Sequence, residues 1–134
     1  MLNIAYVGFG KSTNRYHIPY VRQRPDKFHI SRVVAPHLDK RPKEREALEK
    51  TGTIFSTDIQ DIITDNTLDL VIVVTPAPTH FAFARQLLLA GKNILVDKPL
   101  VATAQEASEL VDLANQKGLF FMPFQNRQIG RAHV

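Results

Sequence analysis

Two glycines at positions 8 and 10 follow a short apolar run and could bring the backbone close to a phosphate group. The run occupies residues 2–7, and the next three residues read Gly8-Phe9-Gly10. In a dinucleotide-binding turn the first glycine permits a tight bend, and the second lets the backbone approach a pyrophosphate at a helix N-terminus. The third glycine of that pattern is replaced by Thr13. The sequence therefore predicts a cofactor loop made of Gly8, Phe9, Gly10, Lys11, Ser12 and Thr13.

The same segment also approximates a P-loop. Residues 5–12 follow the pattern A-x-x-x-x-G-K-S, with Lys11 and Ser12 in the positions that contact phosphate and magnesium. However, Ala5 replaces the first P-loop glycine, and a loop that began there would leave only four residues for the preceding strand. A P-loop nucleotide-binding protein is therefore the less favoured alternative.

Cations replace the acidic residue that NAD-binding domains place after the second strand. That residue lies about 20 positions after the glycines and binds the ribose 2′-hydroxyl. No Asp or Glu occurs between Asp26 and Asp39. His37, Lys40 and Arg41 lie there instead. A missing carboxylate with cations nearby favours a 2′-phosphate, so we expect the cofactor to be NAD(P), with NADP preferred over NAD.

An alternation of strand and helix patterns must position these residues. Short β-branched runs predict buried strands at residues 2–7, 29–34, 53–55, 69–74, 93–96 and 119–124. Segments with helical periodicity predict helices at residues 18–24, 42–51, 58–63, 79–90 and 103–117. This alternation is typical of an α/β fold with a doubly wound parallel sheet, the Rossmann fold, in a single domain.

The composition argues against several other classes of protein. The chain has 134 residues, of which 44% are hydrophobic and 22% charged, as in one globular domain. No apolar run approaches the ~18 residues of a membrane span, and no signal-peptide pattern opens the chain, so we expect a cytoplasmic protein. Cysteine is absent and no two histidines have metal-ligand spacing, so we expect no metal.

The net charge of +4 has a simple explanation in the middle of the chain. Many basic residues fall between positions 22 and 50, which could indicate a nucleic-acid surface. Glu44, Glu46 and Glu49 alternate with them. Mixed charges at helical spacing are typical of a solvated helix face, so we expect no nucleic-acid partner.

Two later segments make the interpretation specific. Residues 75–80 read T-P-A-P-T-H, and residues 90–99 read A-G-K-N-I-L-V-D-K-P. With T-A-Q-E-A at residues 103–107, they resemble the ordered T-P-x-x-x-H, A-G-K-x-V-x-x-E-K-P and T-x-x-E-A segments of the glucose–fructose oxidoreductase/inositol dehydrogenase/MocA-like (Gfo/Idh/MocA) family. The resemblance covers residues 1 to about 127.

The resemblance implies an NAD(P)-dependent oxidoreductase that transfers hydride to or from a sugar, polyol or related hydroxy compound. It implies that Thr75, Pro76 and His80 lie along the central and nicotinamide-side parts of the cofactor. It also implies that Gln125 and Asn126 border the nicotinamide. For His80 a second interpretation stays open, because a histidine at a helix start can be a packed or capping residue.

Lys98 is the expected catalytic residue. The resemblance implies that it reaches the nicotinamide ribose and the substrate hydroxyl, where its charge can stabilise an alkoxide as hydride leaves. Asp97 stands where the family usually has Glu, and it would orient Lys98 through a side chain one methylene shorter.

The expected domain organisation is a NAD(P)-binding domain at residues 1–127 followed by a tail at residues 128–134. The tail resembles one reading frame of a sequencing adapter, so we expect read-through on a truncated gene. In the family a second, mostly antiparallel domain follows and supplies the substrate pocket, a general-base histidine and much of a homo-oligomer interface. Without it we expect the fragment to be inactive alone; the alternative function is a non-catalytic NAD(P)-sensing module.

Overall fold

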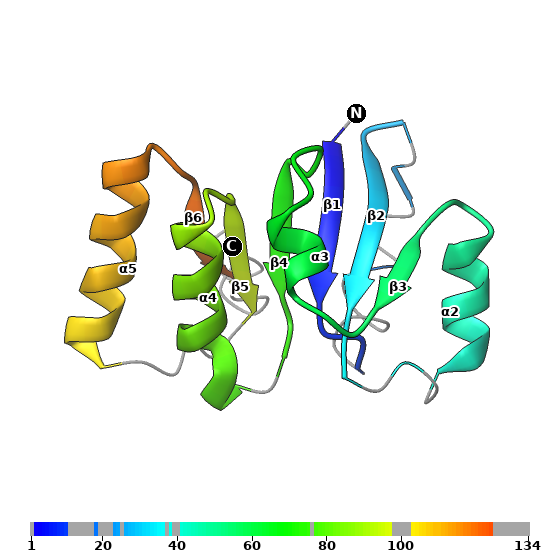
Figure 1. Cartoon of the computed structure of the whole chain (residues 1–134), viewed down its shortest axis with the longest axis horizontal. Coiled ribbons are helices and arrows are strands. Elements are labelled where there is room, and N and C mark those ends of the chain that lie inside the picture. Colours follow the sequence, from blue (N-terminus) through cyan, green and yellow to red (C-terminus); the bar gives the residue numbers. More distant parts are fainter. Residues whose placement is uncertain are drawn as a thin grey trace, which may run out of the picture.

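The structure is a computed structural model that describes residues 2–10, 18, 23–24, 26–36, 38, 41–75, 77–97 and 103–124. Its strands are β1 (Leu2–Val7), β2 (Phe28–Val34), β3 (Ile54–Ser56), β4 (Leu70–Val73), β5 (Ile94–Asp97) and β6 (Phe121–Phe124). Its α-helices are α2 (Pro42–Glu49), α3 (Gln60–Ile63), α4 (His80–Leu89) and α5 (Ala104–Lys117), with a 3-10 helix, η2 (Ala77–Thr79). From β2 onward, strands and helices alternate along the described parts of the chain, as Figure 1 shows.

The six strands form one parallel sheet in the order β3-β2-β1-β4-β5-β6. This is the strand order of the doubly wound dinucleotide-binding fold, and it confirms the predicted fold class. The chain moves outward from β1 in one direction through β2 and β3. It then returns to the other side of β1 and moves outward through β4, β5 and β6, so the order reverses between β1 and β4.

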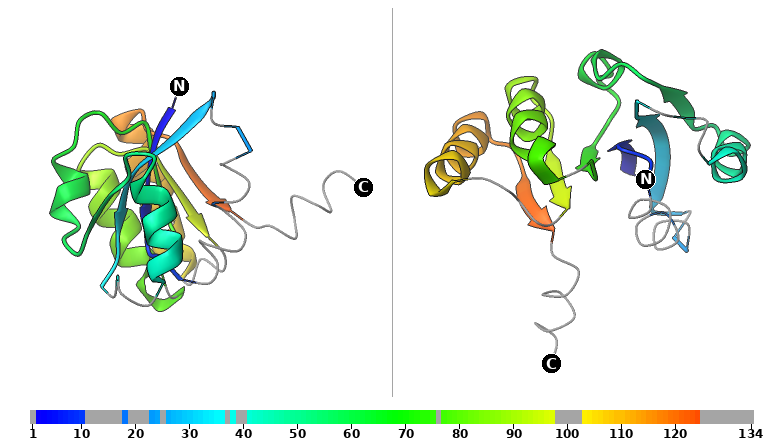
Figure 2. Two further views of the ribbon diagram at one scale, coloured as in Figure 1. Left: turned by 90° about the vertical axis from the view of Figure 1, so that its right-hand side faces the viewer. Right: turned by 90° about the horizontal axis from the view of Figure 1, so that it is seen from below.

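Two apolar clusters lie on the two faces of the sheet. One cluster joins α3, α4 and α5 to β4 and β5, with Ile62, Leu87 and Leu110 fully buried. The other joins α2 to β1 through Leu48, Ile4 and Tyr6. Figure 2 shows α4 and α5 together on one side of the sheet and α2 at its other end. Because right-handed crossovers place helices on opposite faces for the two directions of travel, the arrangement follows from the strand order.

The predicted strands are confirmed, with ends that differ by a residue or two. The helix predicted at residues 79–90 begins as η2 and continues as α4, and the helix predicted at 58–63 is shortened to α3. Of the helix predicted at 18–24, the structure describes Ile18, which is helical and buried, and residues 23–24, which are not helical; the prediction otherwise falls outside the described residues. None of the described helices is both long and apolar enough to cross a membrane.

The charge pattern of α2 agrees with a solvated helix face. Arg45 pairs with Glu49 at 3.5 Å, and Lys50 pairs with Glu46 at 3.7 Å, in both cases four residues apart. Such exposed pairs contribute only about 0.3–0.5 kcal/mol each. The helix is therefore held mainly by the buried Leu48.

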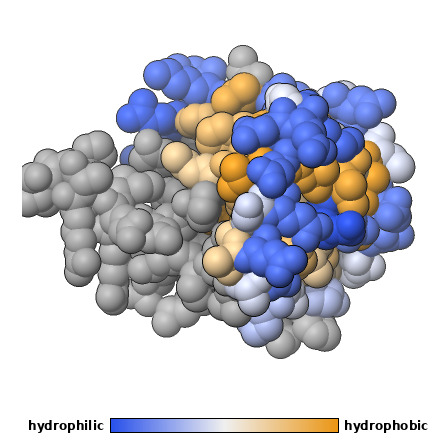
Figure 3. Space-filling model, turned by 90° about the vertical axis from the view of Figure 1, so that its left-hand side faces the viewer, coloured by the Kyte–Doolittle hydropathy of each residue, from blue (hydrophilic) through white to orange (hydrophobic). Residues whose placement is uncertain are grey.

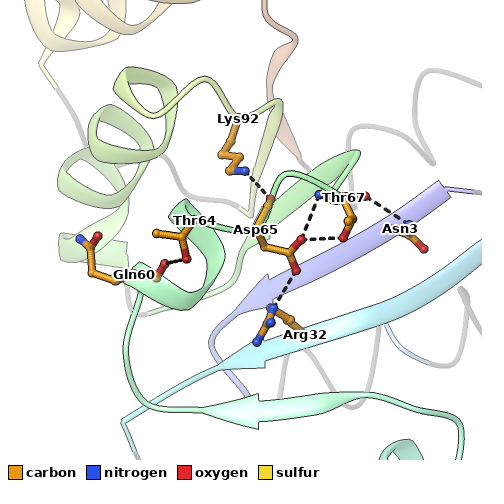
Figure 4. Close-up of polar contacts among 7 residues, drawn as sticks. All are labelled: Asn3, Arg32, Gln60, Thr64, Asp65, Thr67 and Lys92. Atoms are coloured by element: carbon orange, nitrogen blue, oxygen red, sulfur yellow. Dashed lines mark hydrogen bonds and ion pairs between the residues drawn. The ribbon is translucent and has the colours of Figure 1, made fainter.

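Asp65 joins four segments at the amino edge of the sheet (Figure 4). Its carboxylate accepts hydrogen bonds from Thr67 N at 2.9 Å, from Thr67 Oγ1 at 2.6 Å and from Arg32 Nε at 2.7 Å. Its backbone carbonyl accepts from Lys92 Nζ at 2.6 Å. Thr67 O in turn accepts from Asn3 Nδ2 at 3.2 Å. The α3–β4 turn is thereby tied to β1, to β2 and to the start of β5.

These contacts lower the pKa of Asp65. The Thr67 hydroxyl, followed by Arg32, holds the pKa of this carboxyl at about 2, below its ordinary value of 3.8. A group whose pKa is lower in the folded state stabilises the fold above its unfolded pKa. That stabilisation is lost as pH falls through the folded value.

We therefore expect Asp65→Asn to lower the free energy of unfolding by about 1–2 kcal/mol at pH 7. The difference from wild type should shrink between pH 4 and pH 2, because the wild-type carboxyl is then protonated too. Denaturant unfolding at several pH values measures it. Asp112→Asn is the matched control, since Asp112 is exposed on α5. An Asp65→Asn deficit of equal size at pH 7 and pH 2 would contradict the assignment.

Candidate functional site

The predicted cofactor residues that the structure describes gather at the carboxyl edge of the sheet, where the arrowheads of β1, β2 and β5 point in Figure 1. The register pairs Val7 with Val73 and Val73 with Val96. The carboxyl ends of β1, β4 and β5 therefore lie side by side. Open α/β sheets bind ligands in the crevice at this edge, at the point where the strand order reverses.

Gly8 is required by the close approach of the turn after β4. Its φ is +111°, in the region that residues with a Cβ rarely adopt. A Cβ built at Gly8 would lie 2.9 Å from both the carbonyl carbon and the carbonyl oxygen of Val74, and 3.1 Å from Thr75 N. Two backbone hydrogen bonds fix the neighbourhood: Gly8 N donates to Val34 O, and Val74 N donates to Val7 O, each at 2.8 Å.

Gly10 has the opposite surroundings. Among the described residues other than its chain neighbours, no atom lies within 4 Å of a Cβ built there, and Gly10 is exposed. The first glycine of the turn is thus tight and the second faces open space, as expected where a pyrophosphate must approach the backbone. The described part of the loop fits a dinucleotide on this observation.

Phe9, between the glycines, anchors the loop in the core. It is 6% exposed, and its ring meets that of Phe55 edge-on, with centroids 5.0 Å apart and an interplanar angle of 76°. The Phe55 ring also contacts Arg45, whose guanidinium lies 5.3 Å from the ring centroid. The sequence placed Phe9 in the cofactor loop, and its packing against Phe55 is signalled there only by an aromatic residue between two glycines.

The Thr75–His80 turn follows β4 beside the glycine turn. His80 is 1% exposed, and its Nε2 lies 2.6 Å from the carbonyl oxygen of Thr75. Thr79 Oγ1 donates to Thr75 Oγ1 at 2.7 Å. The ring of His80 is therefore packed inside the turn, which is the arrangement of the second interpretation left open above; its contact with cofactor stays a prediction.

Other predicted site residues lie outside the described part of the chain. These are Lys11, Ser12, Thr13, His37, Pro76, Lys98, Gln125 and Asn126. Asp97 is the last residue of β5, and the structure describes its backbone but not its side chain. In the sequence, Lys98 directly follows β5, which lies beside β4.

One further feature, a cavity, lies away from this edge of the sheet. A cavity of about 510 Å³ lies between α4 and α5 and is lined by residues of both helices, including the Arg85–Glu109 ion pair at 2.9 Å. Figure 3 looks onto this side of the molecule, where hydrophilic residues are interspersed with apolar ones.

Within the described ranges, no group of three or more His, Cys, Asp or Glu residues could hold a metal ion.

The strand order and the glycine turn at the reversal point define a dinucleotide-binding Rossmann domain. The P-loop alternative fails, since Ala5 is fully buried in β1 rather than in a loop. The family model for oxidoreductases with an NAD-binding Rossmann fold (Gfo/Idh/MocA) matches residues 2–125, so the chain belongs to this family.

Known relatives are much longer than this chain. It is 41% identical over 128 residues to the uncharacterized oxidoreductase YhhX of Escherichia coli (strain K12), which aligns over 96% of the chain and 36% of the relative. It is 26% identical to scyllo-inositol 2-dehydrogenase (NADP(+)) IolW of Bacillus subtilis (strain 168), over 95% of the chain and 34% of the relative. The chain thus spans about a third of the curated relatives it matches.

Solved structures likewise match this chain along about a third of their own length. A crystal structure of an oxidoreductase from Bacillus cereus superposes with a TM-score of 0.88 at 35% identity, covering 95% of this chain and 35% of that one. GenD2 from gentamicin A biosynthesis, solved in complex with NAD, superposes with a TM-score of 0.78 at 28% identity, over 91% and 34%.

We expect Gly8→Ala to destabilise the domain by about 3 kcal/mol, because the added methyl group combines backbone strain with a backbone clash. Neither Val74 nor Thr75 can yield at that point without moving β4. Thermal unfolding followed by circular dichroism should show a melting temperature lower by roughly 10 °C. An unchanged melting temperature would contradict the observed contact.

Gly10→Ala is the matched control for stability. The same methyl group enters open space there, so the melting temperature should stay at the wild-type value. If the space receives the pyrophosphate, affinity for NADPH should still fall roughly tenfold, or ~1.4 kcal/mol. Fluorescence titration of NADPH measures it, and full affinity in this variant would argue against a phosphate at Gly10.

Proposed function

We propose that this chain is the cofactor-binding domain of an enzyme that moves hydride between a nicotinamide and a hydroxyl-bearing carbon of a sugar or polyol. The observation that carries the proposal is the contrast between the tight Gly8 and the open Gly10 at the point where the strand order reverses. Family membership supports the reaction class. The substrate class draws on the name of the relative IolW, which is an inositol dehydrogenase.

The residues around the crevice divide into two groups. Backbone of Gly8, Phe9 and Gly10 would approach the pyrophosphate, with Lys11, Ser12 and Thr13 following at the start of the next segment. The nicotinamide half would lie against Thr75, Pro76, Asp97, Lys98, Gln125 and Asn126.

Lys98 is the proposed catalytic residue. A lysine directly after β5 would extend toward the cofactor, where its ammonium would hold the substrate oxygen and stabilise negative charge on it. Asp97 would orient that ammonium. When bound, the nicotinamide supplies the carbon that accepts or donates the hydride. The general base and the substrate pocket belong to the remainder of the full-length protein, which we propose to be a cytoplasmic homo-oligomer.

We expect NADP to be preferred to NAD. The carboxyl end of β2 leads to His37, Lys40 and Arg41, and no carboxylate lies between Asp26 and Asp39 to repel a 2′-phosphate. Fluorescence titration of the purified chain should therefore give tighter binding for NADPH than for NADH, by about tenfold. The preference should weaken with added salt, because it is electrostatic. Tighter binding of NADH would overturn the assignment.

In the full-length protein, we expect Lys98→Ala to lower kcat by about 10²–10⁴-fold, whereas NADPH affinity should fall only a few-fold through loss of the contact with the nicotinamide ribose. The reason is that the ammonium acts on charge that develops on the substrate oxygen. Steady-state kinetics with an inositol or aldose substrate, together with NADPH titration, measures both. NADPH binding without turnover in the wild-type full-length protein would instead favour the non-catalytic sensing module.

A further inference from the structure

His80 is enclosed by protein at the first position of α4. Only 1% of the residue is exposed, so the ring offers almost no surface to a ligand in the crevice. Its Nε2 lies 2.6 Å from Thr75 O. A carbonyl oxygen only accepts, so Nε2 carries the proton and donates it to this bond. His80 therefore reaches back across the turn to Thr75, two residues beyond the end of β4.

Thr75 is held by the turn at a second point. The hydroxyl of Thr79, the residue before His80, donates to the hydroxyl of Thr75 at 2.7 Å. The segment through η2 is thus closed on Thr75 twice, once at its backbone carbonyl and once at its side chain.

The backbone of Thr75 packs against the glycine turn. The missing Cβ of Gly8 would lie 3.1 Å from Thr75 N and 2.9 Å from the Val74 carbonyl atoms. A displacement of Thr75 would therefore open or close the space beside Gly8. The distance between the turn after β1 and the turn after β4 depends on where His80 holds Thr75.

We propose that His80 is a positioning residue for dinucleotide binding, acting through Thr75 to set the spacing between the β4–α4 turn and the glycine turn. The proposal rests on the proposed function, because the spacing matters only if a dinucleotide bridges the two turns. The turn after β4 belongs to the β4–β6 half of the sheet, which takes the nicotinamide half of the cofactor. Loss of the His80 hydrogen bond should therefore weaken binding of the nicotinamide half of the cofactor and leave binding of the adenosine half unchanged.

The test compares two ligands on the full chain, NADPH and 2′,5′-ADP, which carries only the adenosine half. His80→Leu removes the donor at similar volume, and it should weaken NADPH about tenfold while leaving 2′,5′-ADP within about twofold. His80→Gln restores an amide donor and should recover most of the NADPH affinity. His29→Leu is the matched control at the amino end of β2; it should change neither affinity.

A second variant, Thr79→Val, tests the same proposal if His80→Leu does not fold. It removes the second bond to Thr75 at nearly constant shape, and it should weaken NADPH by about threefold with 2′,5′-ADP unchanged. Circular dichroism confirms that each variant is folded before titration.

Three results would overturn the proposal: equal loss of both ligands, unchanged NADPH affinity in folded His80→Leu, or no recovery in His80→Gln. Equal loss would make His80 a residue of general stability, and absent recovery would point to a direct contact of the imidazole with the cofactor. If the wild-type chain binds neither NADPH nor NADH, the proposed function fails together with this role. If it binds NADPH and His80→Leu binds it equally, only this role fails.

Discussion

At their carboxyl ends the two central strands, β1 and β4, lead into turns so close that no Cβ fits between them at position 8. The contact is backbone against backbone, Gly8 against Val74 and Thr75, and it lies where the strand order reverses. The β1–β4 pairing from Ile4 and Leu70 to Val7 and Val73 brings the two turns into register. The positions of the candidate site residues depend on this close contact, because each turn limits where the other can lie.

The rest of the molecule supports that approach from both faces. Phe9 draws the glycine loop into the cluster beneath α2, where it meets Phe55. On the other face, Ala84, Leu87 and Leu88 bury α4 against the sheet, which fixes the helix that starts with His80. Phe9 and Val74, the residues that lead into the two turns, therefore share one cluster, whereas the helix that follows the turn after β4 is anchored in the other.

The sequence predicted the fold because each strand and helix carries a local signal. The β-branched run at residues 69–74 and the glycines that end α4 and α5 are examples. It could not predict contacts between residues distant in the chain, such as Arg32 with Asp65 or Gly8 with Val74, which depend on strand order and register. The two interpretations of His80 were likewise undecidable, because a helix-start position does not reveal which way a ring turns.

The two edges of this sheet have separate duties. The Asp65 network fastens the amino edge through Arg32, Thr67 and Lys92, whereas the glycine turn and the Thr75–His80 turn occupy the carboxyl edge. Four-residue strands such as β4 separate the edges by roughly 13 Å, beyond the range at which substitutions usually interact. Changes at the two edges should then combine additively. An engineer could strengthen one edge and redesign cofactor preference at the other as independent tasks.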